Sequence, residues 1–284
     1  MDKNTYFTFG GLVLGGLLAS SANAQFGTQA AELDLIKVQD DLYVIHNELV
    51  PGNTVALITD DGVLLVDDKF EIDHDNLMAI LKTVTDQPVK YVINTHYHGD
   101  HSGGNAKLQA MDAIAVASDQ ARMRMVAANQ PGLPDVTVRD AASLYIGGKP
   151  VQLYWLGRSH TDGDVVVLFP EHGVLAAGDM YTVGEGLPQL IDYAGGGSAK
   201  EWTATVDKVL QLDFDTVVPG HGTVVTKADM QQFRDSTVRL RELVGELVSQ
   251  NKPKAEVEAA MRADFGWQDF HVQMSLDGLI NEMR

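Results

Sequence analysis

A short apolar strand that runs directly into three histidines and an aspartate constrains this chain more than any other feature. Residues 92–101 read Val-Ile-Asn-Thr-His-Tyr-His-Gly-Asp-His, in a chain with only nine histidines. Neutral imidazoles and carboxylates suit zinc, and the i, i+2 spacing at a strand end directs His96 and His98 to one side, where both can reach one ion. Asp100 and His101 follow on the turn, displaced toward a second position. We interpret this stretch as a metal site rather than as a polar loop with incidental histidines.

The charge and composition of the chain limit what such a site can serve. The 21 Lys and Arg against 39 Asp and Glu give a formal net charge of −18, which argues against a nucleic-acid partner because binding to phosphates depends on cationic side chains. The chain has no cysteine, so its metal ligands must be His, Asp or Glu, and it offers no thiol nucleophile. Hydrophobic residues make up 45% of the 284 positions, which is ample for a packed core.

The N-terminal segment predicts export. Residues 7–20 form an apolar run that is shorter than the ~20 residues needed to span a bilayer, and Ala22-Asn23-Ala24 matches an A-x-A cleavage pattern. The positively charged segment that usually precedes such a run is thin here, so an uncleaved anchor or a disordered tail is the alternative. We expect residues 1–24 to be a signal peptide and residues 25–284 to form a single domain with C-terminal helices. The mature protein is then periplasmic or secreted, with no stable membrane insertion.

Strand and helix patterns alternate through the rest of the chain. The first half predicts strands at 42–45, 54–59, 63–67, 89–94 and 113–117, and helices at 72–84, 106–111 and 119–128. The second half predicts strands at 151–156, 164–169, 174–177 and 216–218, a helix after the Ser198–Glu201 capping box, and a long helix from Thr226. Because strands and helices are intermixed in both halves, we expect an α/β fold of two sheets packed face to face, with helices outside.

Three more residues of ligand type stand where predicted strands end. His160 lies in a turn between two strand runs, Asp179 closes the run that starts at Val174, and His221 follows Pro219 and a glycine. Glycine beside a ligand lets the backbone approach a crowded site closely. A single strand-end histidine is more often a hydrogen-bonded loop residue, but three such positions after the first cluster indicate further metal ligands.

This order, His-x-His-x-Asp-His followed by separate His, Asp and His at strand ends, resembles the metallo-β-lactamase-fold superfamily of hydrolases. The resemblance covers roughly residues 42–226. It implies a four-layer αβ/βα sandwich with the site along one edge. The ligands it implies are His96, His98 and His160 for one zinc ion, Asp100, His101 and His221 for the other, and Asp179 as a bridge between the two Zn²⁺.

The resemblance and the chemistry of zinc also suggest roles for residues around the ions. Zinc lowers the pKa of bound water from about 15.7 toward roughly 7, so a zinc-bound hydroxide can attack a carbonyl without a Ser or Cys nucleophile. Asp100 can orient that nucleophile, and Asp67 stands where the family often has an aspartate that hydrogen-bonds the ligand loop. For substrate contacts we consider Tyr181 and Tyr193 as donors to a developing oxyanion, and Arg158, with Lys200, as the grip for a substrate carboxylate.

Departures from the family pattern leave the substrate open. One lactamase subclass uses a cysteine thiolate where this chain has Asp179, and binds the substrate carboxylate with a lysine that this chain lacks there. The ligand set is similar instead to the glyoxalase II, lactonase and ribonuclease Z branches. Export would separate the enzyme from cytoplasmic glutathione thioesters, and the negative charge disfavours RNA.

We therefore expect an exported dinuclear zinc hydrolase of a small carbonyl substrate, best a β-lactam bound with weak affinity. The alternatives are a lactone or thioester hydrolase, a mononuclear iron sulfur dioxygenase, and a metal-binding module without catalysis.

Overall fold

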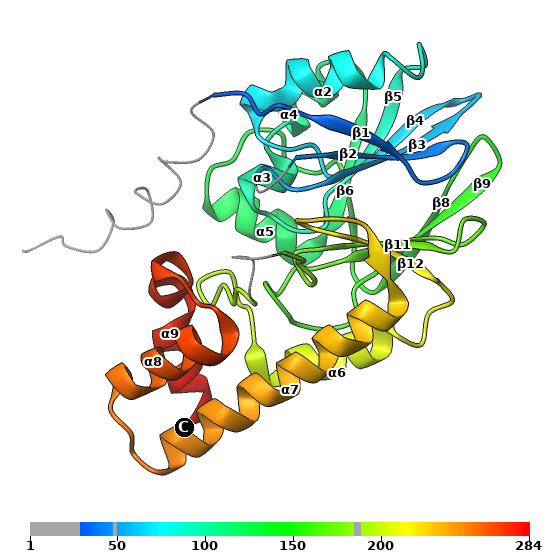
Figure 1. The fold of residues 1–284 in the computed structure, drawn as a ribbon. Coiled ribbons are helices and arrows are strands. Elements are labelled where there is room, and N and C mark those ends of the chain that lie inside the picture. The colour runs from blue at the N-terminus through cyan, green and yellow to red at the C-terminus, as the bar shows by residue number, and fades with distance from the viewer. Residues whose placement is uncertain (1–28, 48–49, 185–188) are drawn as a thin grey trace, which may run out of the picture.

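Two β-sheets lie face to face with helices on their outer sides, as Figure 1 shows. The computed structural model describes residues 29–47, 50–184 and 189–284, so the expected signal peptide at residues 1–24 lies outside the described part of the chain. The predicted α/β class and the layered sandwich are confirmed. Within the described ranges, no helix is both long and apolar enough to cross a membrane.

The first sheet follows the order of the chain, β1-β2-β3-β4-β5-β6-β7. Neighbouring strands are antiparallel from β1 to β4 and parallel from β4 to β7. The parallel pairs need crossover connections, which the intervening helices supply. The strands are β1 (Asp34–Lys37), β2 (Leu42–His46), β3 (Thr54–Thr59), β4 (Gly62–Val66), β5 (Val89–Ile93), β6 (Ile114–Ser118) and β7 (Val136–Val138).

The second sheet has the order β13-β12-β11-β10-β9-β8. All its neighbouring strands are antiparallel except β11 and β12, which run parallel. The strands are β8 (Ala141–Ile146), β9 (Lys149–Tyr154), β10 (Val166–Phe169), β11 (Val174–Gly178), β12 (Thr216–Pro219) and β13 (Val225–Thr226).

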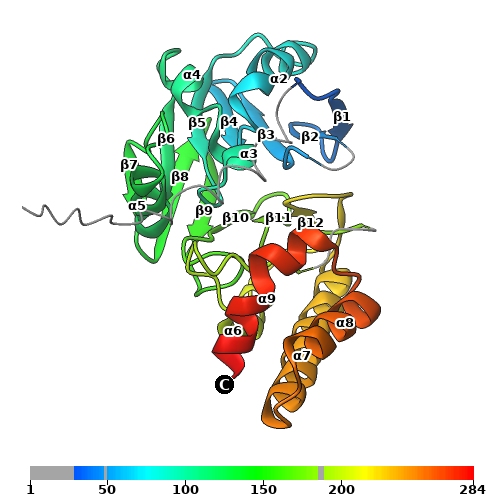
Figure 2. The ribbon, with the colours of Figure 1, turned by 90° about the vertical axis from the view of Figure 1, so that its left-hand side faces the viewer.

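The helices cover the outer faces of both sheets and group at one end of the molecule. Figures 1 and 2 show α2 and α4 over the first sheet, α6 and α7 under the second, and α7, α8 and α9 gathered at the C-terminal end. The predicted N-cap Ser198 starts α6 by accepting from Glu201 N, but Ser198 N donates to the Ser159 carbonyl rather than completing a capping box. The helix predicted from Thr226 is α7, and Thr226 with Asp229 forms its capping box. The helices are α2 (His74–Leu81), α3 (Gly99–Ser102), α4 (Asn105–Gln109), α5 (Asp119–Ala127), α6 (Ala199–Val209), α7 (Lys227–Ser249), α8 (Lys254–Phe265) and α9 (Asp269–Met283), with a 3-10 turn at Glu71–Asp73.

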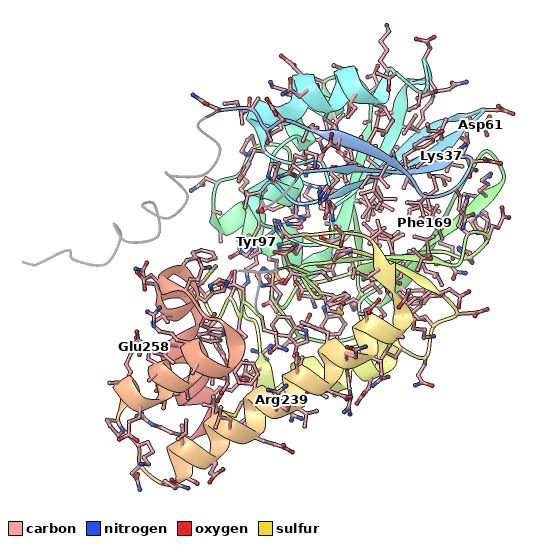
Figure 3. All side chains as sticks on the ribbon, viewed as in Figure 1. Lys37, Asp61, Tyr97, Phe169, Arg239 and Glu258 are labelled. Carbon is pink, nitrogen blue, oxygen red and sulfur yellow. The ribbon has the colours of Figure 1, made fainter. Side chains whose placement is uncertain are left out.

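Three apolar layers hold these four structural layers together. Leu77 of α2 packs on the outer face of the first sheet, and Phe169 lies between the sheets (Figure 3). Trp202 of α6 and Leu276 of α9 pack in the layer on the outer face of the second sheet. Burial of this apolar area is the main stabilising term of the fold.

The strands that the sequence did not predict all lie at the edge of a sheet and carry exposed side chains. They are β1, β7, β8 and β13, and each terminates a sheet. Edge strands bury little, so they lack the apolar runs that mark central strands. The predicted strand at 164–169 is wrong at its start, because Asp164 is buried in a turn, where it accepts from Thr161 N at 2.9 Å.

Candidate metal centre

The ligand-type side chains meet at one edge of the sandwich, because that is where their strands end. β5 ends at Ile93 and leads into the loop that carries His96 and His98, and β11 ends at Gly178, directly before Asp179. The parallel register of β11 and β12 pairs Gly178 with Pro219, so the residues that follow these two strands lie side by side. Figure 3 shows Tyr97 of the same loop at this edge.

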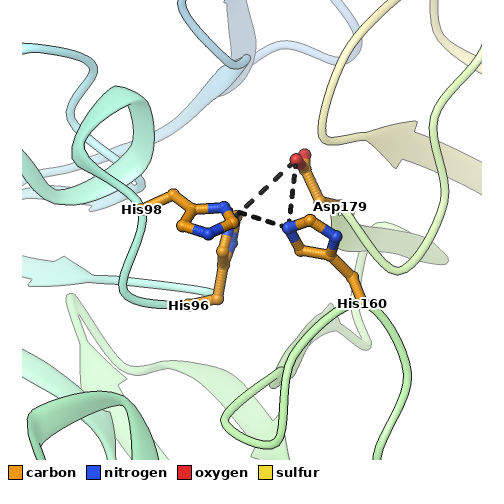
Figure 4. A group of neighbouring side chains, drawn as sticks. All are labelled: His96, His98, His160 and Asp179. Carbon is orange, nitrogen blue, oxygen red and sulfur yellow. Dashed lines mark hydrogen bonds and ion pairs between the residues drawn. The ribbon is translucent and has the colours of Figure 1, made fainter. Parts of the chain in front are cut away.

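The seven residues form two groups, and within each group the ligand atoms lie within 4.8 Å of one another. The three-histidine group is His96, His98 and His160, with Asp179; the second group is Asp100, His101 and His221. His98 Nδ1 lies 3.1 Å from His96 Nε2 and 3.0 Å from His160 Nε2, and Figure 4 shows these imidazoles turned toward one another. In the second group, the Nε2 atoms of His101 and His221 are 3.2 Å apart.

Asp179 stands between the two groups and turns one oxygen to each. Its Oδ2 lies 3.9 Å from His96 Nε2 and 3.7 Å from His160 Nε2. Its Oδ1 lies 3.2 Å from His101 Nε2 and 3.3 Å from His221 Nε2. A carboxylate in this position can contact one cation in each group at the same time.

In each of these histidines, one ring nitrogen faces the ligand cluster (the inner nitrogen) and the other faces away from it (the outer nitrogen). The hydrogen-bond partner of the outer nitrogen determines which tautomer the ring adopts. His98 Nε2 donates to Asp192 Oδ2 at 3.0 Å, His160 Nδ1 to the Leu190 carbonyl at 2.7 Å, and His101 Nδ1 to Asp67 Oδ2 at 2.7 Å. Carbonyl and carboxylate oxygens only accept, so these outer nitrogens carry a proton, and each ring in its neutral form then offers the lone pair of its inner nitrogen to a cation. These tautomers follow from the partners of each ring.

Converging lone pairs make the arrangement suitable for a divalent cation. In the three-histidine group, neutral imidazole nitrogens that face each other at 3.0 and 3.1 Å repel one another, and a shared cation would turn this repulsion into coordination. Nitrogen and carboxylate donors of this kind suit zinc. Support of each ligand by a hydrogen bond on its outer side is also typical of metal sites. The residues present therefore fit the metal that the sequence predicted.

The electrostatics of the second group indicate how strongly it attracts positive charge. Burial lowers the pKa of His221, but the carboxylates of Asp179 and Asp100 outweigh burial and raise it to about 10. Burial also raises the pKa of Asp179, yet His221 and His101 hold it well below its usual range. The carboxylates are thus ionised and can be neutralised by protons on the imidazoles or by a metal ion, so metal binding should release protons.

Asp67 ties the ligand loop to the end of β4. It is buried, and it accepts from Thr95 N at 2.7 Å and from Thr95 Oγ1 at 2.8 Å, besides His101. The Thr95 oxygen lies 3.1 Å from His96 Nδ1 and can accept from it, because its own hydrogen goes to Asp67. One carboxylate therefore orients a histidine in each group.

A buried lysine holds Gly52, on the connection between β2 and β3, against the site. Lys69 is fully buried, and its Nζ donates to the carbonyls of Ile45 at 3.0 Å and Gly52 at 2.7 Å. A Cβ at Gly52 would stand 2.2 Å from the His101 ring, so only glycine allows this approach. Burial lowers the pKa of Lys69 to about 7. No motif or spacing in the sequence marks this lysine.

Three of the four side chains considered for substrate contact have partners within the described part of the chain. The Arg158 guanidinium donates to the carbonyls of Gly196 and Gly197, and its third partner is Glu201. Tyr193 Oη donates to Glu282. Tyr181 is buried, and its ring packs on Phe233 with centroids 4.7 Å apart. Sequence proximity to the ligands did not determine where these side chains point.

Two supporting groups were missed by the sequence reasoning. Leu190 contributes a backbone carbonyl, which no sequence pattern reveals. Asp192 accepts from both His98 and Tyr97 Oη, the latter at 2.5 Å. It follows two apolar residues, but it does not end a predicted strand and has no glycine beside it, so it lacked the signal that marked Asp179.

Comparison with known proteins gives relatives that share this fold. A profile described as the metallo-beta-lactamase superfamily matches residues 47–221. The chain is 28% identical over 190 residues to a metallo-beta-lactamase type 2 of Bacillus cereus, covering 66% of this chain and 73% of that protein. It is 29% identical over 204 residues to a metallo-beta-lactamase type 2 of Bacteroides fragilis, covering 66% and 79%.

Solved structures superpose on most, but not all, of the chain. A metallo-beta-lactamase from Pontibacter korlensis gives a TM-score of 0.66 at 23% identity, covering 72% of this chain and 99% of its own. The DIM-1 metallo-beta-lactamase gives 0.64 at 20% identity, covering 74% and 99%. About a quarter of this chain thus has no counterpart in these structures.

Proposed function

This chain belongs to the metallo-beta-lactamase superfamily of metal-dependent hydrolases, and we propose that it is an exported dinuclear zinc hydrolase of a small carbonyl substrate, with a β-lactam as the first candidate. The observation that supports two ions rather than one is the position of Asp179, whose two oxygens face separate groups of ligands. A mononuclear site, such as that of an iron sulfur dioxygenase, would not need His101 and His221 as ligands. We propose residues 25–284 as its one domain.

Zinc bound at these groups would lower the pKa of a coordinated water toward about 7 and polarise the substrate carbonyl. The chain's own contribution begins with Asp100, whose pKa burial raises but His101 and His221 hold well below its usual range. Asp100 is therefore an ionised acceptor at neutral pH, and we propose that it orients the nucleophilic water by accepting a hydrogen bond from it.

Access to the centre supports the same role for Asp100. The side chains of His98 and Asp100 are 20% and 18% exposed, whereas those of His96, His101 and His160 are at most 1% exposed. Substrate would therefore approach from the side of His98 and Asp100, and the buried ligands would exclude water from the opposite side.

The choice of a β-lactam rests on the names of the relatives and on the proposed export. Both curated relatives described above are metallo-beta-lactamases, and residues 7–24 have the character of a cleaved signal. Residues 180–184, which follow Asp179, contain no Lys or Arg, and Arg158 is held by Gly196, Gly197 and Glu201. We therefore propose that the substrate carboxylate is gripped weakly and that KM for a penicillin is high.

The substrate is tested with zinc-loaded protein and three compounds: a penicillin, an acyl lactone and a glutathione thioester. We expect hydrolysis of the penicillin with a high KM, and a chelator-treated sample serves as the control for contaminating enzymes. Activity confined to the thioester would overturn the β-lactam assignment while leaving the hydrolase class in place.

Export is tested separately by mass spectrometry of protein from the native host. We expect a mature chain that begins at Gln25, since cleavage follows Ala24. An intact Met1 on soluble cytoplasmic material would refute export.

A further inference from the structure

The residues that orient two of the three histidines in the three-histidine group come from one short segment outside the ligand motif. We call residues 190–193 the strap. The Leu190 carbonyl accepts from His160 Nδ1, and Asp192 Oδ2 accepts from His98 Nε2. The strap also bonds to the backbone of the loop between β9 and β10, because Asp192 N donates to the His160 carbonyl at 2.9 Å. The inner nitrogens of His98 and His160 therefore point inward only while the strap stays in place.

The strap belongs to no helix or strand, so its position depends on what packs against it. The centre of the strap is fixed by Ser275 of α9, whose Oγ accepts from Ile191 N at 3.0 Å and donates to the Ile191 carbonyl at 2.9 Å. One side chain thus satisfies both backbone groups of a fully buried residue, as a neighbouring strand would otherwise do.

Two further residues of α9 hold the end of the strap. Tyr193 Oη donates to Glu282 Oε2 at 2.7 Å. A Cβ at Gly278 would lie 2.2 Å from the Tyr193 ring, so glycine is needed for the helix to lie flat against it. Ser275, Gly278 and Glu282 are spaced by three and four residues and share one face of the helix.

Glu282 joins this face to the start of α6. Besides Tyr193, its carboxylate accepts from Ser198 Oγ at 2.5 Å and from Ala199 N at 2.9 Å. These groups lie at the N-terminus of α6, where a negative charge is favoured by the helix dipole. Loss of this carboxylate would therefore loosen the strap and its attachment to α6 together.

We propose that α9 is a positioning element for the metal centre, in which Ser275 and Glu282 hold the strap so that His98 and His160 keep the tautomer and orientation that bind zinc. This inference rests on the proposed zinc site and assigns a role to a helix that begins at Asp269, beyond the end of the family match at residue 221. Partners of this kind typically contribute roughly 10–100-fold to metal affinity. Because α9 acts through the strap, we expect the lower end of that range.

The test compares zinc binding in three variants of the full chain. Glu282→Ala removes the carboxylate, Glu282→Gln keeps an oxygen that can accept from Tyr193, and Asp277→Asn changes an exposed carboxylate on the same helix whose ion-pair partner is Lys254. Zinc is titrated against a chromophoric chelator, and imidazole ¹⁵N shifts assign each binding step to a group of histidines and report the tautomers of His98 and His160.

We expect Glu282→Ala to lower zinc affinity roughly tenfold at the three-histidine group and to mix the tautomers of His98 and His160, with little change at His101 and His221. Glu282→Gln should keep most of the zinc affinity that Glu282→Ala loses, and Asp277→Asn should bind zinc like the parent. Ser275→Ala is an independent variant expected to give the same pattern.

Lower thermal stability in Glu282→Ala, with zinc affinity and tautomers equal to those of Asp277→Asn, would show that α9 is only structural and overturn the inference. If the unsubstituted protein bound no zinc at the histidines, the proposed function itself would fail, so the two failures are distinguishable.

Discussion

The three-histidine group and the second group use the same kinds of ligand, but their supports come from different parts of the molecule. His101 of the second group is oriented by Asp67 and enclosed by Gly52, both from the first sheet and its loops. His98 and His160 are oriented by the strap, which α9 holds from the C-terminal end. The difference teaches that His101 is oriented by the first sheet and its neighbouring loops alone, whereas His98 and His160 also need the last helix of the chain.

Removal of the shared ligand should give the largest effect, because it belongs to both groups. In Asp179→Ala we expect loss of turnover and release of one of two zinc ions, since the ions would repel each other without the carboxylate between them. Elemental analysis and a circular dichroism spectrum of the variant check this. If it kept two tightly bound zinc ions and near-normal rates, the bridging position of Asp179 would be wrong.

The supports should be separable by two matched substitutions. Asp67→Asn should lower zinc affinity mainly at the second group, and Asp192→Asn mainly at the three-histidine group, each by roughly 10–100-fold. Zinc-edge anomalous diffraction from crystals grown at limiting zinc would give the occupancy of each site. Equal loss at both sites in both variants would contradict the division of the centre into separately supported groups.

Lys69, which lies beside the second group, should make the free energy of unfolding depend on pH. Its pKa is lowered by burial from 10.5 to about 7, so between these values the unfolded chain binds a proton that the folded chain does not. The free energy of unfolding therefore rises with pH across this window because of Lys69.

The variant Lys69→Met cannot show this rise. We expect the difference in unfolding free energy between the parent and the variant to grow by about 2 kcal/mol in favour of the parent from pH 7.5 to 9.5. Denaturant titrations of zinc-loaded protein at both pH values measure it. If the difference in unfolding free energy between parent and variant were the same at pH 7.5 and 9.5, Lys69 would keep its charge when buried.

The smallest effect is expected at the end of the sandwich opposite the metal centre. Asp41 bonds there to Lys149 and to His172 Nε2, the latter at 2.8 Å. Asp41 and Lys149 are partly exposed, so Asp41→Asn should lower the free energy of unfolding by about 1 kcal/mol or less and leave zinc affinity unchanged. Thermal melts and the chelator titration together check this, and a change in zinc affinity would mean that the two ends are coupled.

Sequence patterns marked the candidate ligands better than the residues that hydrogen-bond to them, for a physical reason. Asp179 and His221 follow short apolar strands and stand beside glycine, a local pattern that can be read without the fold. Asp67 also follows a strand, but its role was suggested by the resemblance to the family and not by a neighbouring glycine. Asp192 lies 94 positions from His98 in a segment without periodicity, and its role depends on α9, which no local pattern connects to it.

The same limit applies to the direction of long side chains near the ligands. Arg158 stands two residues before His160, but the carbonyls of Gly196 and Gly197 determine its direction. Periodicity places central strands and helices well, yet it does not indicate which distant backbone group a long side chain will reach.

The most direct test of the whole account is the metal content of the purified full-length protein, measured by elemental analysis after growth with both zinc and iron available. Two groups of ligands joined by Asp179 predict two zinc ions per chain. A metal-replete sample that contains a single iron ion per chain would contradict the dinuclear zinc centre.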